Sequence, residues 1–289
     1  MEAQDTHTEA RLRPQDWDLI VATFSILMGI LYALEVYTDP MVNSPLLDIK
    51  HYEELARSIT DGTYSGAFFV DPFYLLVRAG IMGVFGYGFW PPILLNLVAL
   101  ALSAVALRRL GTRMVSLNVG LGAAFMLPLC KAVLFYQALA MKETLALAFL
   151  LWAMLLLMRF LDGEGRKKLV GAGVLMALAV LTRGNLLIMM PALVLPLLDF
   201  KAWKSLKAQS RAFIFVGAFI LPIVPFTIWN YSQSGDVIPI TYNLGNNFYQ
   251  GNNPEYAGTD FYNPPFTGDR PALEEQGWRE EMVRRQRKR

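Results

Sequence analysis

The sequence predicts an all-α polytopic membrane protein with about seven transmembrane helices of about 20 residues each. Of its 289 residues, 54% are hydrophobic and only 17% are charged, and the mean hydropathy is +0.36. A soluble domain would carry about 25% charged residues. The charges are also unevenly placed, because long apolar runs alternate with short basic clusters. This distribution excludes a soluble globular enzyme, a disordered chain and a nucleic-acid-binding protein.

The apolar runs predict the individual spans, which are 19–37, 89–107, 115–139, 145–160, 169–181, 186–200 and 213–229. The fifth and sixth runs are short and are separated by Thr182-Arg183-Gly184-Asn185. We expect a hairpin of two short helices here, with Arg183 at its turn. A single helix over 169–200 would place one of two basic clusters outside, against the positive-inside rule.

Basic residues predict the orientation of the chain. If the N-terminus is cytoplasmic, thirteen basic residues near the span ends fall on the cytoplasmic side, where such residues accumulate. They are Arg11, Arg13, Arg108, Arg109, Arg113, Arg159, Arg166, Lys167, Lys168, Lys201, Lys204, Lys207 and Arg211. We therefore expect a transmembrane domain over 1–231 with a long outer loop at 38–88, and an extracytoplasmic segment over 232–289.

The outer loop contains two predicted helices. Apolar residues recur at helical spacing from Asp48 to Ile59, which is typical of an amphipathic helix lying on a membrane. The apolar run 72–86 is only about 15 residues long, so we expect an interfacial or re-entrant helix rather than a span. Asp71 before Pro72 is a common helix start. Asp48 is suited to be the N-cap of this helix and also to be a general base. The two roles are compatible, because a carboxylate that caps a helix is also held in a fixed position.

Ionisable residues at membrane depth mark a candidate site, because such groups are costly there and are usually paired or functional. On the predicted topology, the outer half holds Arg78, Lys131, Lys142, Glu143 and Arg183, together with Asp48 and Asp71. Considered alone, each of these basic residues is also explained without a function, as a long side chain that extends its charge to the membrane–water interface. Together they predict a site for a phosphate-bearing ligand whose tail stays in lipid.

The sequence becomes polar after Trp229. The run 237–240 predicts a brief strand, and the Asn- and Gly-rich run 241–254 predicts a tightly turning loop. The amides and aromatic rings of this loop suit a sugar, which they would hydrogen-bond and stack on. An ordinary surface loop has the same composition.

Five short motifs occur in order along the chain. They are Asp48 with His51-Tyr52, Ala56 and Gly62; Asp71-Pro72-Phe73-Tyr74 with Phe85-Gly86; Leu181-Thr182-Arg183-Gly184-Asn185; Asn230-Tyr231 with Gly235-Asp236, Asn246-Asn247-Phe248-Tyr249 and Gly251-Asn252-Asn253-Pro254; and Trp278-Arg279-Glu280-Glu281. This series resembles the polyprenyl-phosphate-sugar-dependent GT-C membrane glycosyltransferases, which include the protein mannosyltransferase and aminoarabinose transferase types of glycosyltransferase family 39.

The resemblance implies a GT-C-like fold and inverting transfer of a sugar from a polyprenyl-phosphate donor. The acceptor would be a lipid, a glycan or a protein, on the outer face of a bacterial inner membrane. Asp48 matches the catalytic carboxylate. The donor phosphate would be bound by Arg183, Lys142, Lys131 and Arg78, and the sugar by Tyr52, Asp71, Glu143, Asn247, Tyr249 and Asn252.

Three points stay open at this stage. Ile49 follows Asp48 where many relatives carry an acidic residue, so the need for a divalent cation is not decided, and no other cofactor is implied. A non-catalytic subunit that binds or transports lipid-linked sugars is the alternative function. Relatives continue past the position of Arg289 with more spans, so we expect a fragment, a split gene or a shortened member of the family.

Overall fold

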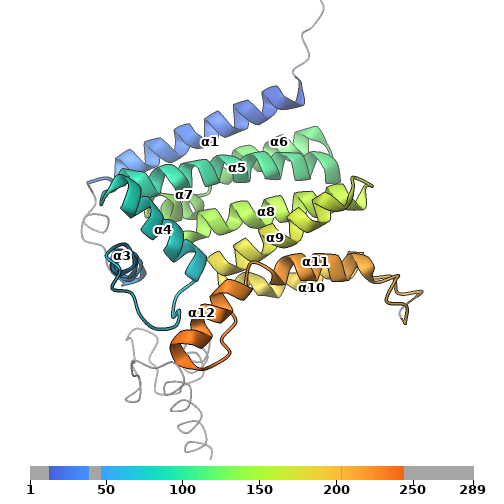
Figure 1. Ribbon diagram of the computed structural model, residues 1–289. Helices are drawn as coiled ribbons and strands as arrows, with labels where there is room; N and C mark the ends of the chain where they lie inside the picture. Colours follow the sequence, from blue (N-terminus) through green and yellow to red (C-terminus); the bar gives the residue numbers. More distant parts are fainter. Residues whose placement is uncertain (1–12, 39–46, 203, 244–289) are drawn as a thin grey trace, which may run out of the picture.

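The structure is a computed structural model that describes residues 13–38, 47–202 and 204–243, except for the side chains of residues 47 and 48. Its main body is a helical bundle (Figure 1). Each helix packs on the next in the order α1 (Pro14–Val36), α5 (Trp90–Met114), α8 (Lys142–Leu161), α9 (Arg166–Thr182) and α11 (Ser210–Ile220). The predicted all-α membrane architecture is confirmed.

Two predicted spans are bent rather than straight. Run 115–139 forms α6 (Leu117–Met126), the 3₁₀ turn η1 (Leu127–Leu129) and α7 (Lys131–Ala138), with a bend of 54°. Run 213–229 forms α11 and α12 (Val224–Ser234), which are bent by 47°. Each break contains a proline, Pro128 or Pro222, which lacks a backbone N–H and cannot continue the helical hydrogen-bond ladder.

The hairpin predicted over 169–200 is confirmed. Helix α9 ends at Thr182, Arg183 is its C-cap residue, and the chain turns back through η2 (Gly184–Met189), α10 (Met190–Val194) and η3 (Leu195–Leu197). Leu193 and Leu197 of the returning arm pack in the same apolar core as α9. The returning arm is short 3₁₀ and α pieces instead of one helix, because Pro191 and Pro196 interrupt it.

By length and composition, three helices described in the structure could cross a membrane, namely α1, α5 and α8, or five if each bent pair is one span. This is fewer than the predicted seven. The two remaining runs are α9, which has only 17 residues, and the broken arm 184–197. They traverse the bundle as a hairpin but are too short or too irregular to qualify alone.

The two helices predicted in the outer loop are both present. They are α3 (Leu47–Thr60) and α4 (Pro72–Phe85), which lie at one end of the bundle (Figure 1). Tyr52 and Ala56 of α3 share a buried cluster with Tyr74, Leu75 and Ala79 of α4. Helix α4 also packs on α5 and α9, so the loop is a packed layer on the bundle.

Residues 237–240 form no strand, so that prediction was wrong. The segment is instead held by the fully buried side chain of Asn230 in α12. Its Nδ2 donates to the carbonyls of Ile238 (2.9 Å) and Ile240 (3.0 Å), and its Oδ1 accepts from the amide of Phe68 (2.8 Å). A side-chain amide therefore satisfies the polar backbone groups that a neighbouring strand would otherwise have paired.

The bundle has two chemically different ends. At the end opposite α3 and α4, Asp18 of α1 binds Arg108 (2.6 Å) and Arg109 (2.6 Å) at the end of α5. The α8–α9 turn lies at this same end, where Arg113 pairs with Asp162. The other end carries α3, α4, the start of α8 and the end of α9, and it holds most of the candidate site residues.

Candidate functional site: a charge cluster and an arginine-lined cavity

Asp71 is the centre of a cluster that joins four segments of the chain. It is the N-cap residue of α4, but its carboxylate does not cap that helix. One oxygen accepts a hydrogen bond from the amide of Gly184 (2.9 Å). The other accepts from Tyr52 OH of α3 (3.2 Å) and from Lys142 Nζ of α8. The carboxylate of Asp71 therefore accepts hydrogen bonds from donors in three other elements.

Lys142 is held by two partners. Its ammonium contacts Asp71 and also donates to Tyr52 OH at 2.8 Å. Tyr52 is only 2% exposed, and the side chains of Lys142 and Asp71 are 16% and 10% exposed. The positive charge of Lys142 is thus already balanced by Asp71, and it adds little net charge to the site.

A second ion pair lies beside the first. Arg183, at the end of α9, binds Glu143 Oε1, and Glu143 directly follows Lys142 in α8. Glu143 Oε2 is buried without a hydrogen-bond partner. Because an unpaired buried acceptor is costly, this oxygen is available to a ligand hydroxyl that reaches the start of α8.

Arg78 differs from Lys142 and Arg183 because it forms no ion pair with a carboxylate that the structure describes. It is 8% exposed, and none of the described carboxylates lies within ion-pair distance of it. Its Nη1 donates to the carbonyl of Ala140 at 3.2 Å, and its Nε has no partner. A buried guanidinium without a counter-ion is strongly disfavoured unless an anion binds it.

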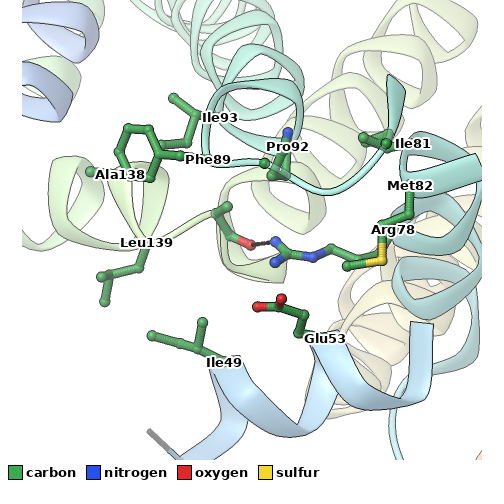
Figure 2. Close-up of a pocket in the computed structure, with 13 residues that line it drawn as sticks. Ile49, Glu53, Arg78, Ile81, Met82, Phe89, Pro92, Ile93, Ala138 and Leu139 are labelled. Atoms are coloured by element: carbon green, nitrogen blue, oxygen red, sulfur yellow. Dashed lines mark hydrogen bonds between the residues drawn. The ribbon is translucent and has the colours of Figure 1, made fainter. Parts of the chain in front are cut away.

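The guanidinium of Arg78 points into a cavity of about 270 Å³. Figure 2 shows it between Ile49 and Glu53 of α3 on one side and the turn 138–140 on the other. The remaining wall is mostly apolar and comes from α4 and the start of α5, including Met82 and Ile93. Glu53, the carboxylate that lines this cavity, lies 3.8 Å from Arg57.

The turn that receives Arg78 has an unusual backbone. Ala140 has φ = 50°, which is the only positive φ at a non-glycine residue in the described ranges. Its carbonyl accepts from both Arg78 and Tyr74 OH, and the neighbouring carbonyl of Met141 accepts from Asn96 Nδ2 (2.9 Å). Burial raises the pKa of Tyr74 above its ordinary value, which keeps the phenol protonated as a donor. Strained backbone of this kind concentrates at functional sites.

The structure brings together Tyr52, Asp71, Lys142, Glu143 and Arg183, and it places Arg78 in the adjacent cavity. Lys131 is exposed at the start of α7 and joins neither group. Asp48 lies in α3 one helical turn before Tyr52, but its side chain is outside the description. Asn247, Tyr249 and Asn252 lie outside the described residues.

Two features of the cavity were not predicted from the sequence. Glu53 lines it, although the sequence places that residue on the polar face of an amphipathic helix. Ala140 supplies the acceptor for Arg78, and nothing in its residue type indicates this. The spacing of Tyr74 and Arg78, four apart on α4, was the one available signal, because residues i and i+4 share a helix face.

A metal site is not formed by the side chains that the structure describes. Within them, no three His, Cys, Asp or Glu side chains are grouped closely enough to hold an ion. The described carboxylates of the cluster instead face Lys142 and Arg183. These described side chains do not fit a divalent cation.

A comparison with protein families gives a match over more than half of the chain. A family model described as dolichyl-phosphate-mannose-protein mannosyltransferase matches residues 70–229. This range includes Asp71, Arg78, Lys142, Glu143 and Arg183, and it begins after α3. Searches of curated proteins and of solved structures found no match.

Proposed function

The chain belongs to the dolichyl-phosphate-mannose-protein mannosyltransferase family, whose members are membrane glycosyltransferases of the GT-C type, and we propose that it uses a polyprenyl-phosphate sugar as its donor. The sugar is transferred with inversion to a lipid, glycan or protein acceptor on the outer face of a bacterial inner membrane. The observation that carries this proposal is the buried, unbalanced guanidinium of Arg78 in a largely apolar cavity.

Arg78 binds the phosphate of the donor. A guanidinium presents several N–H donors in a planar fork that matches phosphate oxygens. Nη1 of Arg78 donates to the carbonyl of Ala140, whereas its Nε has no partner among the described residues and remains for a ligand. The apolar wall of the cavity suits the first isoprene units, which continue into the lipid.

The transfer step uses Asp48 as the general base, by its match to the catalytic carboxylate of the family. Asp48 takes the proton of the acceptor hydroxyl, whose oxygen forms a bond to C1 of the sugar. The bond between C1 and the phosphate oxygen breaks on the opposite face, and polyprenyl phosphate leaves with the bonding electrons. The leaving phosphate gains negative charge, which Arg78 stabilises at short range.

Lys142 and Arg183 support this step in different ways. Both are paired with carboxylates, so we assign them mainly to positioning. Lys142 holds Tyr52 in α3 and so fixes the helix that carries Asp48. Glu143 and Asp71 lie beside them as candidates for sugar hydroxyls, as do Asn247, Tyr249 and Asn252 from the last segment. Lys131 is kept as a candidate for the outer edge of the donor path.

One observation favours the alternative function, a non-catalytic subunit that binds or transports lipid-linked sugars. Asp71 and Glu143, the described carboxylates of the charge cluster, are both already paired with cations. A protein that only binds the donor needs Arg78 and no free base. The two functions therefore differ in whether Asp48 is essential.

The test is sugar transfer in membranes that contain the full chain and radiolabelled polyprenyl-phosphate sugars. Asp48→Asn removes the base while keeping the size of the side chain, and we expect transfer to fall by at least about 100-fold. Glu54→Gln is the matched control, because Glu54 lies on the same helix, is exposed and, among the described residues, pairs with Lys50 alone (3.7 Å). Donor binding by the unchanged chain without any sugar transfer would establish the alternative, and normal transfer by Asp48→Asn would show that Asp48 is not the base.

The orientation and the domain division are part of this proposal. The N-terminus lies in the cytoplasm, and the α3–α4 end faces outward, because the basic residues predict that arrangement. The transmembrane domain ends near residue 231 and is followed by an extracytoplasmic segment over 232–289. Both statements rest on the sequence.

A further inference from the structure

A second cavity lies at the opposite end of the bundle from Arg78. Helix α9 starts there at Arg166 and reaches the candidate site at Arg183, and its 17 residues span about 25 Å. The cavity has a volume of about 850 Å³ and lies between the α8–α9 turn and the segment that joins η3 to α11. It cannot belong to the site of sugar transfer.

Four cations line this cavity, and none of them is balanced by a carboxylate. Arg166 comes from the first residue of α9, Lys201 and Lys207 from the connecting segment, and Arg211 from α11. None of the four forms an ion pair among the residues that the structure describes. This differs from Arg108, Arg109, Arg113 and Arg159 at the same end, each of which binds an aspartate or a glutamate.

The connecting segment is built to hold these cations in place. Gln209 is 7% exposed, its Nε2 donates to the carbonyl of Asp199 (2.9 Å), and its Oε1 accepts from the amide of Asp199 (3.1 Å). Asp199 Oδ1 in turn accepts from the amides of Lys201 (3.0 Å) and Ala202 (3.2 Å). The one acidic residue that lines the cavity is thus engaged in shaping the turn.

Apolar surface adjoins the cations. Phe160 and Leu198 line the cavity itself, and the guanidinium of Arg211 lies 5.9 Å from the centre of the Phe160 ring. Phe200, which also lines the cavity, is 64% exposed. Side chains of this kind at the end of a membrane bundle face lipid, so the cavity combines a cationic mouth with an apolar flank.

We propose that this cavity binds the phosphate headgroup of an anionic membrane phospholipid. The cations bind the phosphodiester and the anionic headgroup, and the acyl chains lie along Phe160, Leu198 and Phe200. A free inorganic phosphate shares the same chemistry but would leave most of the volume and all of the apolar flank unused. Basic pockets between helices at a membrane surface recognise lipid headgroups in this way.

The experiment is a titration of the full chain, purified in a neutral detergent, with phosphatidylglycerol, with phosphatidylcholine and with inorganic phosphate. We expect tight binding of phosphatidylglycerol, weak binding of phosphatidylcholine, and little displacement of phosphatidylglycerol by inorganic phosphate. Lys201→Gln/Lys207→Gln/Arg211→Gln should lower the affinity for phosphatidylglycerol by about 100-fold, at about five-fold for each cation removed.

Lys167→Gln is the matched control, because Lys167 is an exposed lysine of the same end that does not line the cavity. It should bind phosphatidylglycerol like the unchanged chain, and Lys207→Arg should do so too because it keeps the charge. The thermal unfolding midpoint without lipid verifies that each variant is folded. Equal binding of both lipids, an equal loss with Lys167→Gln, or full binding by the triple variant would overturn the proposal. Complete displacement by inorganic phosphate would replace the lipid with a free anion.

Discussion

At the scale of single residues, Arg78 is the cation whose chemistry depends most on a ligand. Its neighbour Ala140 offers only a carbonyl dipole, so the guanidinium keeps its full charge for the donor phosphate. We expect Arg78→Gln to raise the KM for the polyprenyl-phosphate donor by about 10- to 100-fold, since a hydrogen bond to a charged group contributes about 1.5–3 kcal/mol. Arg78→Lys should recover part of the affinity, because it restores the charge without the planar fork.

The control for Arg78 is Arg57→Gln. Arg57 is an exposed arginine on the neighbouring helix α3 that pairs with Glu53 and lies over the ring of Tyr87. Steady-state kinetics across a range of donor concentrations separates KM from kcat for both variants. A KM that stays unchanged in Arg78→Gln would remove Arg78 from the donor site.

The pair formed by Asp71 and Lys142 leads to a second prediction. Removing one partner of a largely buried pair leaves the other charge uncompensated. We expect Lys142→Met to lower the free energy of unfolding by about 3 kcal/mol, and Asp71→Asn by a similar amount. The double variant should be less destabilised than the sum of the two, because neither buried charge then remains. Denaturant or thermal unfolding in detergent measures all three, and additive losses would show that the pair does not act as a unit.

Sequence reasoning could find the site residues at this scale but not their pairing. The ionisable residues at membrane depth were visible because they interrupt apolar runs. Which cation stays unbalanced depends on contacts between residues far apart in the chain, such as Asp71 with Lys142 and Glu143 with Arg183. Arg183 and Lys142 were therefore predicted first as phosphate-binding residues, ahead of Lys131 and Arg78, whereas the structure pairs both of them with carboxylates and leaves Arg78 without such a pair.

At the scale of elements, helices α5 and α6 pack through glycine. A Cβ atom on Gly120 would lie 2.3 Å from the carbonyl oxygen of Arg108 and 2.7 Å from the amide of Thr112, both on α5. Gly122, two residues along, has nothing within 4 Å of such an atom. Small residues permit this close approach of helices in membrane proteins.

We therefore expect Gly120→Ala to destabilise the protein by about 1–3 kcal/mol, the usual cost of forcing extra volume into a packed contact. Gly122→Ala makes the same chemical change on the same helix and should have little effect or be slightly stabilising, since alanine favours the helix. The thermal unfolding midpoints of the two variants decide the matter. Equal midpoints would show that the close contact of α5 and α6 at Gly120 does not contribute to stability.

The elements themselves were largely predictable, whereas their breaks were not. Hydrophobic runs located α1, α5, α8 and α9, and helical spacing located α3, because burial and periodicity act locally. The bends after Pro128 and near Pro222 depend on how neighbouring helices satisfy the freed backbone groups, and prolines are tolerated in transmembrane helices. The 237–240 segment failed as a strand because Asn230, rather than a second strand, pairs its carbonyls.

At the scale of the whole molecule, the bundle separates its charges between two ends. One end carries the paired arginines of α1 and α5 together with the unbalanced cations of the second cavity. The other end carries the charge cluster and Arg78. If the donor and a structural phospholipid bind as proposed, each end of the bundle binds a phosphate group. One phosphate then lies at each surface of the bilayer.

This separation predicts how the protein is oriented, and cysteine labelling tests it. Cys130 is the only cysteine, so Cys130→Ala provides a background into which single cysteines are placed. Ser65→Cys lies on the exposed loop between α3 and α4, and Lys167→Cys lies on the exposed start of α9 at the opposite end. In intact cells, a membrane-impermeant maleimide should label Ser65→Cys, while Lys167→Cys should react only after the membrane is opened. The positive-inside rule requires this pattern, and the reverse pattern would place the Arg78 cavity on the cytoplasmic face, so that the sugar donor would have to be drawn from the inner leaflet.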